Sequence, residues 1–261
     1  MCRGLLRVPV APLRPGRLEL DEGTSRYVVR VHRLRAGASL LAFDPEAGLE
    51  ATAELVSDRL PRAQIEVGEV RGTTARPDWK VTLLQGIGKG DKPEQVVRDA
   101  TVLGARRVVF VETERCVARA IGADRRIRER RVAVEAARQA GRGDLPELVG
   151  PRSLAESLTE VAEGEHKLVC GWAPDAEPLL VALARWRPEQ ELVLLIGPEG
   201  GLSPEEVQAA RSAGFRPVSL GTFVLRTETA ATVALGIVQS YAEAQRFRTT
   251  RPSPKTAPSD P

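Results

Sequence analysis

The alternation of apolar runs with helical patterns beyond residue 79 limits the possible folds more than any other feature of this sequence. Short apolar runs lie at 80–85, 107–111, 167–171, 192–196 and 216–220, and helical patterns lie near 93–103, 124–140, 153–163, 175–185, 203–213 and 227–246. Strands that are connected through helices usually run parallel in their sheet. We therefore predict an α/β domain over residues 75–248, with a parallel sheet flanked by helices.

Residues 1–70 follow a different pattern. Segments that alternate apolar and polar residues are separated by glycines and prolines: SRYVVRVHRL (25–34), ASLLAFD (38–44), LEATAELV (49–56) and RAQIEVGEV (62–70). Short, closely spaced strands of this kind predict a small all-β barrel over residues 1–72, with a linker, RGTTARPD, at 71–78. The final stretch, 249–261, holds four prolines and no core-forming residue, so we expect it to be disordered.

The composition argues against several classes of protein. The sequence has no apolar run long enough to span a membrane, and its N-terminus lacks the apolar segment of a secretion signal. Three cysteines (Cys2, Cys116, Cys170) and two histidines (His32, His166) are too scattered for a zinc site or a Ser-His-Asp triad. We expect a reduced, cytoplasmic protein without a metal.

Arginine is concentrated in two segments. Residues 1–35 hold eight arginines against three acidic residues, and residues 121–142 hold seven against three. Such clusters suit nucleic-acid phosphates. The chain has 33 arginines and only five lysines, however, so a general preference for arginine explains the clusters equally well.

Two lysines occupy a glycine-rich loop, GIGKGDK (86–92), directly after a predicted strand. The spacing matches neither the Walker A pattern nor the dinucleotide-binding pattern. Because loops at this end of a strand often bind ligands, Lys89 and Lys92 are candidate binding residues. The alternative is an ordinary turn between a strand and a helix.

The most informative stretch is LVLLIGPEGGLSPEEV (192–207). Ser203 and Glu206 are spaced as a capping box, so Gly197–Gly201 would present bare backbone at the start of a helix. Glu199 would repel a phosphate, and this loop contains no cation. A nucleoside that carries a sulfonium would suit both features, as S-adenosylmethionine does. A simple turn is the alternative.

A second loop of this kind lies in LGTFVLRTETAATVAL (220–235). Small and apolar residues give the following helix one packing face, and Thr227 is placed to cap it. Arg226 stands at the positive end of this helix, where a cation is unfavourable unless it meets an anion or a substrate dipole. This placement indicates a functional role for Arg226.

These two stretches, in this order, closely resemble the last two motifs of the SPOUT methyltransferases, specifically the RsmE family. That family methylates N3 of one uridine in 16S ribosomal RNA of the small subunit. Further matches are KGDK (89–92), ERC (114–116), AARQAGRGDLPEL (136–148) and, toward the N-terminus, YVVRVHRLRAGASLLAFDPEAG (27–48). The resemblance implies a C-terminal trefoil knot that binds S-adenosylmethionine, an N-terminal PUA-like barrel that binds RNA, and a homodimer.

The resemblance also implies roles for individual residues. Arg226 would stabilise the reacting uracil, with Glu199 or Glu228 to orient it. The cofactor would lie against Leu195, Ile196, Gly197, Gly200, Gly201, Leu220, Gly221, Val224 and Leu225. The candidate RNA contacts are Arg3, Arg7, Arg30, Arg33, Lys89, Lys92, Arg115 and Arg142.

Several positions depart from the family pattern. RDATVLG (98–104) stands where the family has a sequence like QKATELG, so Arg98, Asp99 and Val102 are changed, as are His32 and Arg138. These departures leave two alternatives open. The first is a SPOUT enzyme with another rRNA or tRNA target, and the second is a non-catalytic RNA-binding factor in ribosome assembly.

Overall fold

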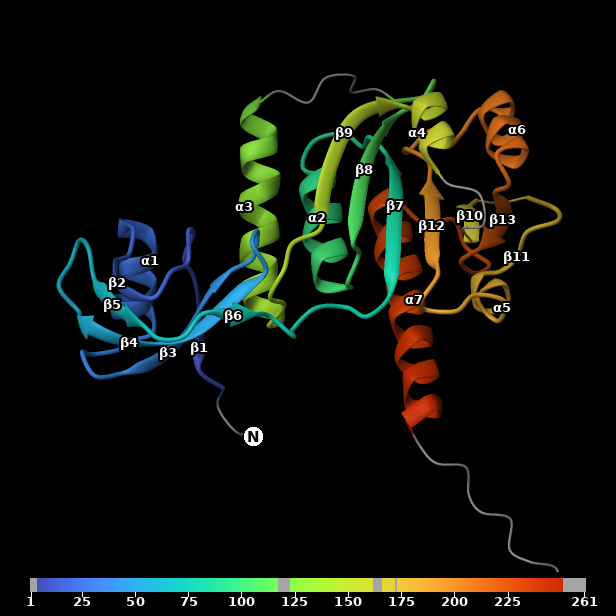
Figure 1. The fold of residues 1–261 in the computed structure, drawn as a ribbon. Coiled ribbons are helices and arrows are strands. Elements are labelled where there is room, and N and C mark those ends of the chain that lie inside the picture. The colour runs from blue at the N-terminus through green and yellow to red at the C-terminus, as the bar shows by residue number, and fades with distance from the viewer. Residues whose placement is uncertain (1–3, 117–122, 162–165, 172, 251–261) are drawn as a thin grey trace, which may run out of the picture.

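The computed structural model describes residues 4–116, 123–161, 166–171 and 173–250, which form two sheets with associated helices (Figure 1). The larger sheet has the order β11-β13-β10-β12-β7-β8-β9, and every ladder in it is parallel. Its strands are β7 (Lys80–Gly86), β8 (Arg107–Glu112), β9 (Glu147–Ser153), β10 (His166–Cys170), β11 (Glu177–Pro178), β12 (Glu191–Ile196) and β13 (Arg216–Ser219). The predicted parallel α/β architecture is confirmed.

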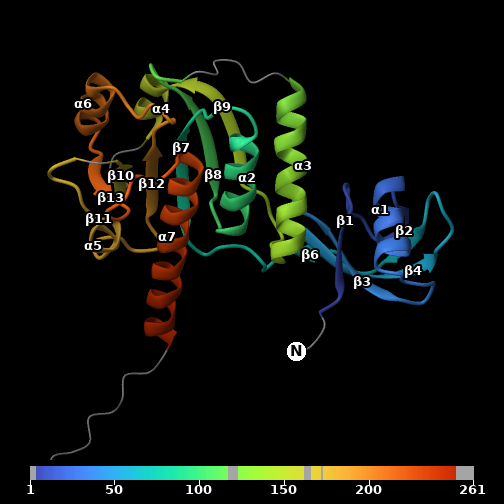
Figure 2. The ribbon, with the colours of Figure 1, turned by 180° about the vertical axis from the view of Figure 1, so that it is seen from behind.

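Helices cover both faces of this sheet. One core cluster packs the sheet against α2 (Lys92–Val102), α3 (Ala123–Ala140), α5 (Leu179–Leu183) and α7 (Thr227–Thr250), and Figure 2 shows α2, α3 and α7 on that face. A second cluster packs the other face against α4 (Leu154–Glu160) and α6 (Pro204–Ser212). Strand β12 contributes Leu194 to the first cluster and Leu195 to the second. Burial on both faces explains why its sequence is continuously apolar.

Two strands of the sheet were absent from the sequence prediction. Strand β9 has few apolar residues and includes Pro151, but it pairs with β8 alone, and such an edge position tolerates proline. The two-residue strand β11 and the short α5 replace the longer helix that we expected at 175–185.

The smaller sheet contains β1 (Leu6–Pro9), β2 (Gly16–Glu19), β3 (Ser39–Asp44), β4 (Leu49–Ser57), β5 (Gln64–Val67) and β6 (Arg71–Gly72). Its ladders follow the order β1-β3-β4-β5-β2, with β6 also paired to β4. The prediction of a strand at 25–34 is wrong. This region is helical, with α1 (Glu22–Arg26) followed by a π-helical turn, η1 (Tyr27–Val31). Asp21 caps α1 by accepting the Thr24 amide at 2.9 Å, and Ser25, Val28 and Val29 are buried at helical spacing.

The segment predicted as a linker packs closely between the two sheets. The first two residues of this segment form strand β6. The next residue, the buried Thr73, donates a hydrogen bond from its hydroxyl to Glu50 at 2.9 Å. The Gly143 amide, on the loop after α3, donates to the Ala75 carbonyl at 2.6 Å. The two domains therefore meet in an ordered junction. At the other end of the chain, α7 extends to Thr250, so the predicted tail begins inside a helix, and 251–261 lie outside the described residues.

The junction yields a stability prediction. A β-carbon added at Gly143 would lie 2.0 Å from the Thr73 hydroxyl oxygen, and Thr73 is held in place by Glu50. Gly143→Ala should therefore lower the free energy of unfolding by about 1–3 kcal/mol, as overpacking does. Gly72→Ala is the control, because no atom lies within 4 Å of the added carbon. Equal urea midpoints for both variants would contradict this account of the junction.

Candidate cofactor and RNA site

A cavity of about 530 Å³ lies at the carboxyl ends of β10, β12 and β13. This is the edge at which parallel α/β sheets bind ligands, and the volume is that of a small-molecule site. Most of the predicted cofactor residues line it: Ile196, Gly197, Gly201, Leu220, Gly221, Val224 and Leu225. The predicted catalytic residues Glu199 and Arg226 line it as well.

The first wall of the cavity is the loop between β12 and α6. The capping box is confirmed, since the Ser203 amide donates to Glu206 at 2.9 Å and the Ser203 hydroxyl accepts the Glu206 amide at 3.3 Å. Gly201 has φ +70°, a conformation that favours glycine. The glycines of this loop therefore bring bare backbone to the cavity.

Two predicted cofactor residues lie behind this wall. Leu195 is fully buried in the core on the α4 and α6 side of the sheet. Gly200 packs against Arg115, whose guanidinium donates to the Gly200 carbonyl at 3.1 Å. Neither residue is among those that line the cavity, and their contact with a cofactor stays a prediction.

The second wall is the loop between β13 and α7, and it is joined to the first through Thr227. The Thr227 hydroxyl donates to the Gly197 carbonyl at 2.6 Å. It also accepts a hydrogen bond from the side-chain amide of Gln85 (Nε2) at 2.8 Å. Thr227 therefore links the two loops and the end of β7, and it does not cap α7 as we expected. The Arg226 carbonyl accepts the first helical bond, from the Ala230 amide at 2.7 Å. Gln85 contributes to the site although the sequence analysis did not select it. Its position as a buried polar residue near the end of the apolar strand β7 is the signal that could have identified it.

Glu199 has a cation partner, contrary to the expectation from its own loop. The Lys92 ammonium lies 2.9 Å from Glu199 Oε1 and 3.4 Å from Glu228 Oε2, and the Lys89 amide donates to Glu199 at 3.0 Å. Burial acts to raise the pKa of Glu199, but the bonds from Lys89 and Lys92 outweigh it and hold this pKa below its ordinary value. The pKa of Lys92 is raised, mainly by its hydrogen bond to Glu199.

Arg226 stands exposed at the rim of the cavity. Within the described part of the chain its guanidinium makes no hydrogen bond and no ion pair, and the expected orientation by Glu199 or Glu228 is absent because both carboxylates face Lys92. The adjacent Phe223 and Val224 are 85% and 95% exposed. An unpaired guanidinium beside exposed apolar side chains is typical of a surface that meets a partner.

The eight candidate RNA contacts lie in different surroundings, and one of them, Lys92, is already paired with Glu199. Arg30, Arg33, Lys89 and Arg115 are exposed, whereas Arg3 lies outside the described residues. Arg7 and Arg142 belong to the domain junction: Arg142 is 6% exposed and is bound to Asp144 and the Thr101 carbonyl, and Arg7 donates to the Arg142 carbonyl at 3.3 Å. Their guanidiniums are engaged within the protein, which contradicts the interpretation of both as RNA contacts.

Three comparisons with known proteins agree with this geometry. A methyltransferase from Legionella pneumophila, solved with S-adenosylmethionine, is 30% identical, with a TM-score of 0.78 over 91% of this chain and 98% of that one. The ribosomal RNA small subunit methyltransferase E of Neisseria gonorrhoeae, also solved with S-adenosylmethionine, gives the same values. The ribosomal RNA small subunit methyltransferase E of Mycobacterium tuberculosis is 34% identical to this chain, over 84% of this chain and 83% of its own length.

The RNA methyltransferase domain family matches residues 75–239, and together with the fold this match defines an α/β methyltransferase that acts on RNA. The chain belongs to the ribosomal RNA small subunit methyltransferase E family, known as RsmE. No helix in the described ranges is long and apolar enough to cross a membrane. The same ranges contain no group of three or more potential metal ligands.

The link through Thr227 can be tested by an isosteric change. Thr227→Val removes the hydroxyl and leaves the Gly197 carbonyl and the Gln85 amide without this partner. Loss of a buried hydrogen-bond partner should cost about 1–3 kcal/mol of unfolding free energy. Thr229→Val, at an exposed position in the same helical turn, should change it by less than about 0.5 kcal/mol. Chemical denaturation measures both, and equal losses would contradict the proposed link.

The ion pair between Lys92 and Glu199 predicts a pH dependence. Because the folded-state pKa of Glu199 is lowered, its contribution to stability is present above the ordinary carboxyl pKa and is lost as the pH falls through the lowered value. Lys92→Met should raise the pKa of Glu199, so that this loss begins at higher pH. Carboxyl ¹³C NMR titration measures the change, and Lys80→Met, at an exposed lysine on β7, controls for net charge. A pKa unaffected by Lys92→Met would contradict the pairing.

Proposed function

We propose that this protein transfers a methyl group from S-adenosylmethionine to N3 of a specific uridine in 16S ribosomal RNA. The observation that carries the proposal is the cavity between two glycine-containing loops, with the unpaired Arg226 at its rim. Family membership supports the RNA substrate class, and relatives with a known structure bind S-adenosylmethionine.

The residues of the cavity suit this cofactor. Backbone groups at Gly197 and Gly221 can bind an uncharged adenosine, and Ile196 and Leu220 supply apolar contacts. The Glu199 carboxylate adds negative charge that favours a sulfonium, although Lys92 neutralises part of that charge. When bound, S-adenosylmethionine supplies an electrophilic methyl group.

Arg226 then has a specific task. Uracil N3 is a poor nucleophile while it is protonated, so the reaction needs stabilisation of negative charge that develops on the base. The Arg226 guanidinium, at the positive end of α7, can donate hydrogen bonds to a uracil oxygen as this charge develops. Glu228 lies in the first turn of the same helix, but its buried Oε2 is 3.4 Å from the Lys92 ammonium, so this carboxylate is already held in an ion pair.

We further propose the assembly that the family resemblance implies. The chain would divide into a PUA-like RNA-binding domain at 1–72, a methyltransferase domain at 75–248 with its trefoil knot at the cofactor loops, and the tail at 249–261. It would act in the cytoplasm as a homodimer, without a metal, on 16S rRNA in the small subunit. Exposed apolar side chains support the dimer, including Phe223 and Val224 beside the cofactor cavity.

A different target base is the second candidate, and the departures on α2 favour it. Arg98 pairs with Asp99 at 2.8 Å, and Asp99 lies 2.7 Å from the Thr232 hydroxyl of α7, while Val102 is 45% exposed. Two of these positions are therefore used within the protein. Val102 and the exposed Arg98 therefore present a changed surface to a substrate.

Nucleoside mass spectrometry tests the proposal. Small subunits from a strain that lacks this gene should accept labelled methyl from the purified protein, and digestion should release 3-methyluridine. Another methylated nucleoside would support the second candidate, whereas no incorporation would indicate a non-catalytic RNA-binding protein.

Substitution of Arg226 separates catalysis from cofactor binding. Arg226→Ala should lower the single-turnover methylation rate by about 10²–10³, the cost of one lost transition-state donor. Calorimetry should show nearly unchanged affinity for S-adenosylhomocysteine, because backbone groups bind the nucleoside. Arg226→Lys should restore little activity, since an ammonium does not reproduce the planar guanidinium. A loss confined to cofactor affinity would remove Arg226 from the chemical step.

A further inference from the structure

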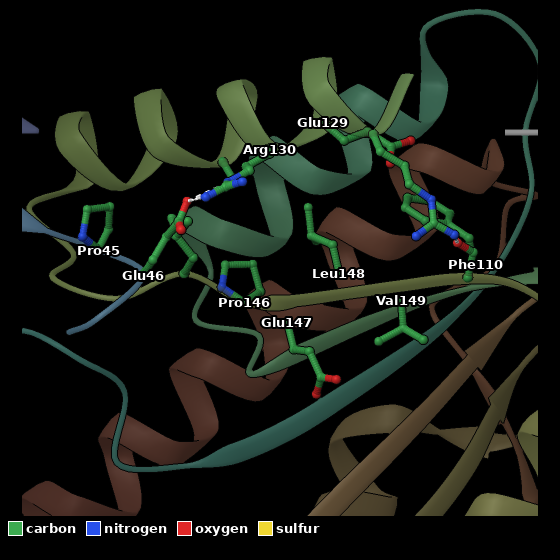
Figure 3. A pocket seen from close by; sticks show the side chains of 13 residues that line it. Pro45, Glu46, Phe110, Glu129, Arg130, Pro146, Glu147, Leu148 and Val149 are labelled. Atoms are coloured by element: carbon green, nitrogen blue, oxygen red, sulfur yellow. Dashed lines mark hydrogen bonds and ion pairs between the residues drawn. The ribbon is translucent and has the colours of Figure 1, made fainter. Parts of the chain in front are cut away.

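A second cavity, of about 450 Å³, lies between α3 and β9 where the two domains meet. Figure 3 shows α3 on one side of it and β9 on the other, with Pro45 and Glu46 of the smaller domain at one end. Its volume is within the range of small-ligand sites, roughly 300–1,000 Å³. Part of its lining falls within the segments 27–48 and 136–148 that resemble the family, but the proposed reaction does not use this cavity.

The walls of this second cavity suit a flat, apolar group. Ala133 of α3 and Leu148 of β9 line its opposite sides, and the buried Phe110 closes it from the core. The rings of Pro45 and Pro146 lie near its end (Figure 3). Apolar side chains that line a pocket can pack against an unstacked nucleobase.

Polar groups at the second cavity can both accept and donate hydrogen bonds. The side chain of Glu129 is 4% exposed, and it lies 3.4 Å from Arg125 without a hydrogen bond at Oε1 in the described chain. Burial, only partly offset by Arg125, raises the pKa of Glu129. Arg126 and Arg130 also line the cavity, and they contact the Gly150 carbonyl and Glu46 respectively. A buried carboxylate with unused acceptor capacity therefore adjoins guanidinium donors.

A chain of contacts connects this cavity to the cofactor cavity. Arg125, the partner of Glu129, donates to the Gly90 carbonyl at 3.2 Å. Gly90 belongs to the same loop as Lys89, whose amide binds Glu199 at the cofactor cavity. The outer face of α3 adds the exposed Arg128 and Arg131, which can contact phosphates. These arginines therefore offer phosphate contacts to an RNA strand on the helix that lines the second cavity.

We propose that the cavity between α3 and β9 binds an unpaired guanine of the substrate RNA. Guanine is the only common base that presents two adjacent N–H donors on its Watson–Crick edge, and these match the Glu129 carboxylate. Its O6 acceptor matches an arginine at the rim, such as Arg126. This inference rests on the proposed action on RNA, and it adds a site that selects the target by a second base.

Mononucleotide titration of the full-length protein tests the guanine site. By NMR, 5′-GMP should bind at least about fivefold more tightly than 5′-AMP, 5′-CMP or 5′-UMP, as one bidentate base contact provides. It should also bind more tightly than 5′-IMP, which lacks the exocyclic amine. Glu129→Gln should abolish this preference, whereas Glu135→Gln, an equal charge change on the same helix, should preserve it. Methyl resonances of Ala133 and Leu148 should shift with GMP in the unaltered protein, a test independent of how the variants fold.

Other outcomes overturn the inference. Equal affinities for all nucleotides, a preference for CMP, or equal losses in the two variants would each exclude a guanine site at Glu129. Failure of the proposed methylation is a separate result, because GMP binding requires neither the cofactor nor the reaction. Binding of S-adenosylhomocysteine should be unchanged in Glu129→Gln, which separates this cavity from the cofactor cavity.

Discussion

The hydrogen bonds of Thr227 join the three segments on which the cofactor site depends. Its hydroxyl connects the Gly197 carbonyl of one loop to the Gln85 side-chain amide near the end of β7. Thr227 is also the first residue of α7, the helix that follows the other loop. Together with Lys92, which approaches both Glu199 and Glu228, this hydroxyl holds the two cavity walls near each other, and the neighbouring Arg226 stays at the rim.

The charges around this link explain how a loop that contains Glu199 can adjoin a nucleoside site. Lys92 neutralises part of the Glu199 charge and also approaches Glu228, so neither carboxylate is available to pair with Arg226. Arg226 consequently presents its donors to whatever lies at the mouth of the cavity. Lys92 is paired with carboxylates, whereas Arg226 has no such partner among the described residues, and this difference is the electrostatic basis of the proposed reaction.

Local signals predicted much of this architecture. The apolar runs of the parallel sheet, the capping box at Ser203 and the functional loops are all encoded within a few neighbouring residues, so sequence reading located them. The pairing of Lys92 with Glu199 joins residues 107 positions apart, since 199 − 92 = 107, and no local pattern reveals it. Strand β9 was missed because an edge strand is buried less and carries a weaker apolar pattern.

Arginine was the residue type that sequence reading interpreted least well. Arg7 and Arg142 suggested phosphate binding, yet burial and carbonyl acceptors place both in the domain junction. Two departures from the family pattern meet there as well: the Arg138 guanidinium lies 4.2 Å over the Tyr27 ring, and the His32 ring centroid lies 4.5 Å from that of Tyr27. Long-range packing, which a linear pattern does not encode, decides which arginines remain available to RNA.

Hydrogen exchange with S-adenosylhomocysteine tests the account most directly. If the two loops bind the nucleoside jointly, amides in both 197–202 and 220–227 should gain protection when this ligand is added, while amides in β3, β4 and β5 should not change. The protection should be reduced in both loops together by Thr227→Val, because this side chain helps to hold them near each other. Protection of one loop alone, or of the α3 and β9 region in place of both, would contradict a cofactor site built from these two walls.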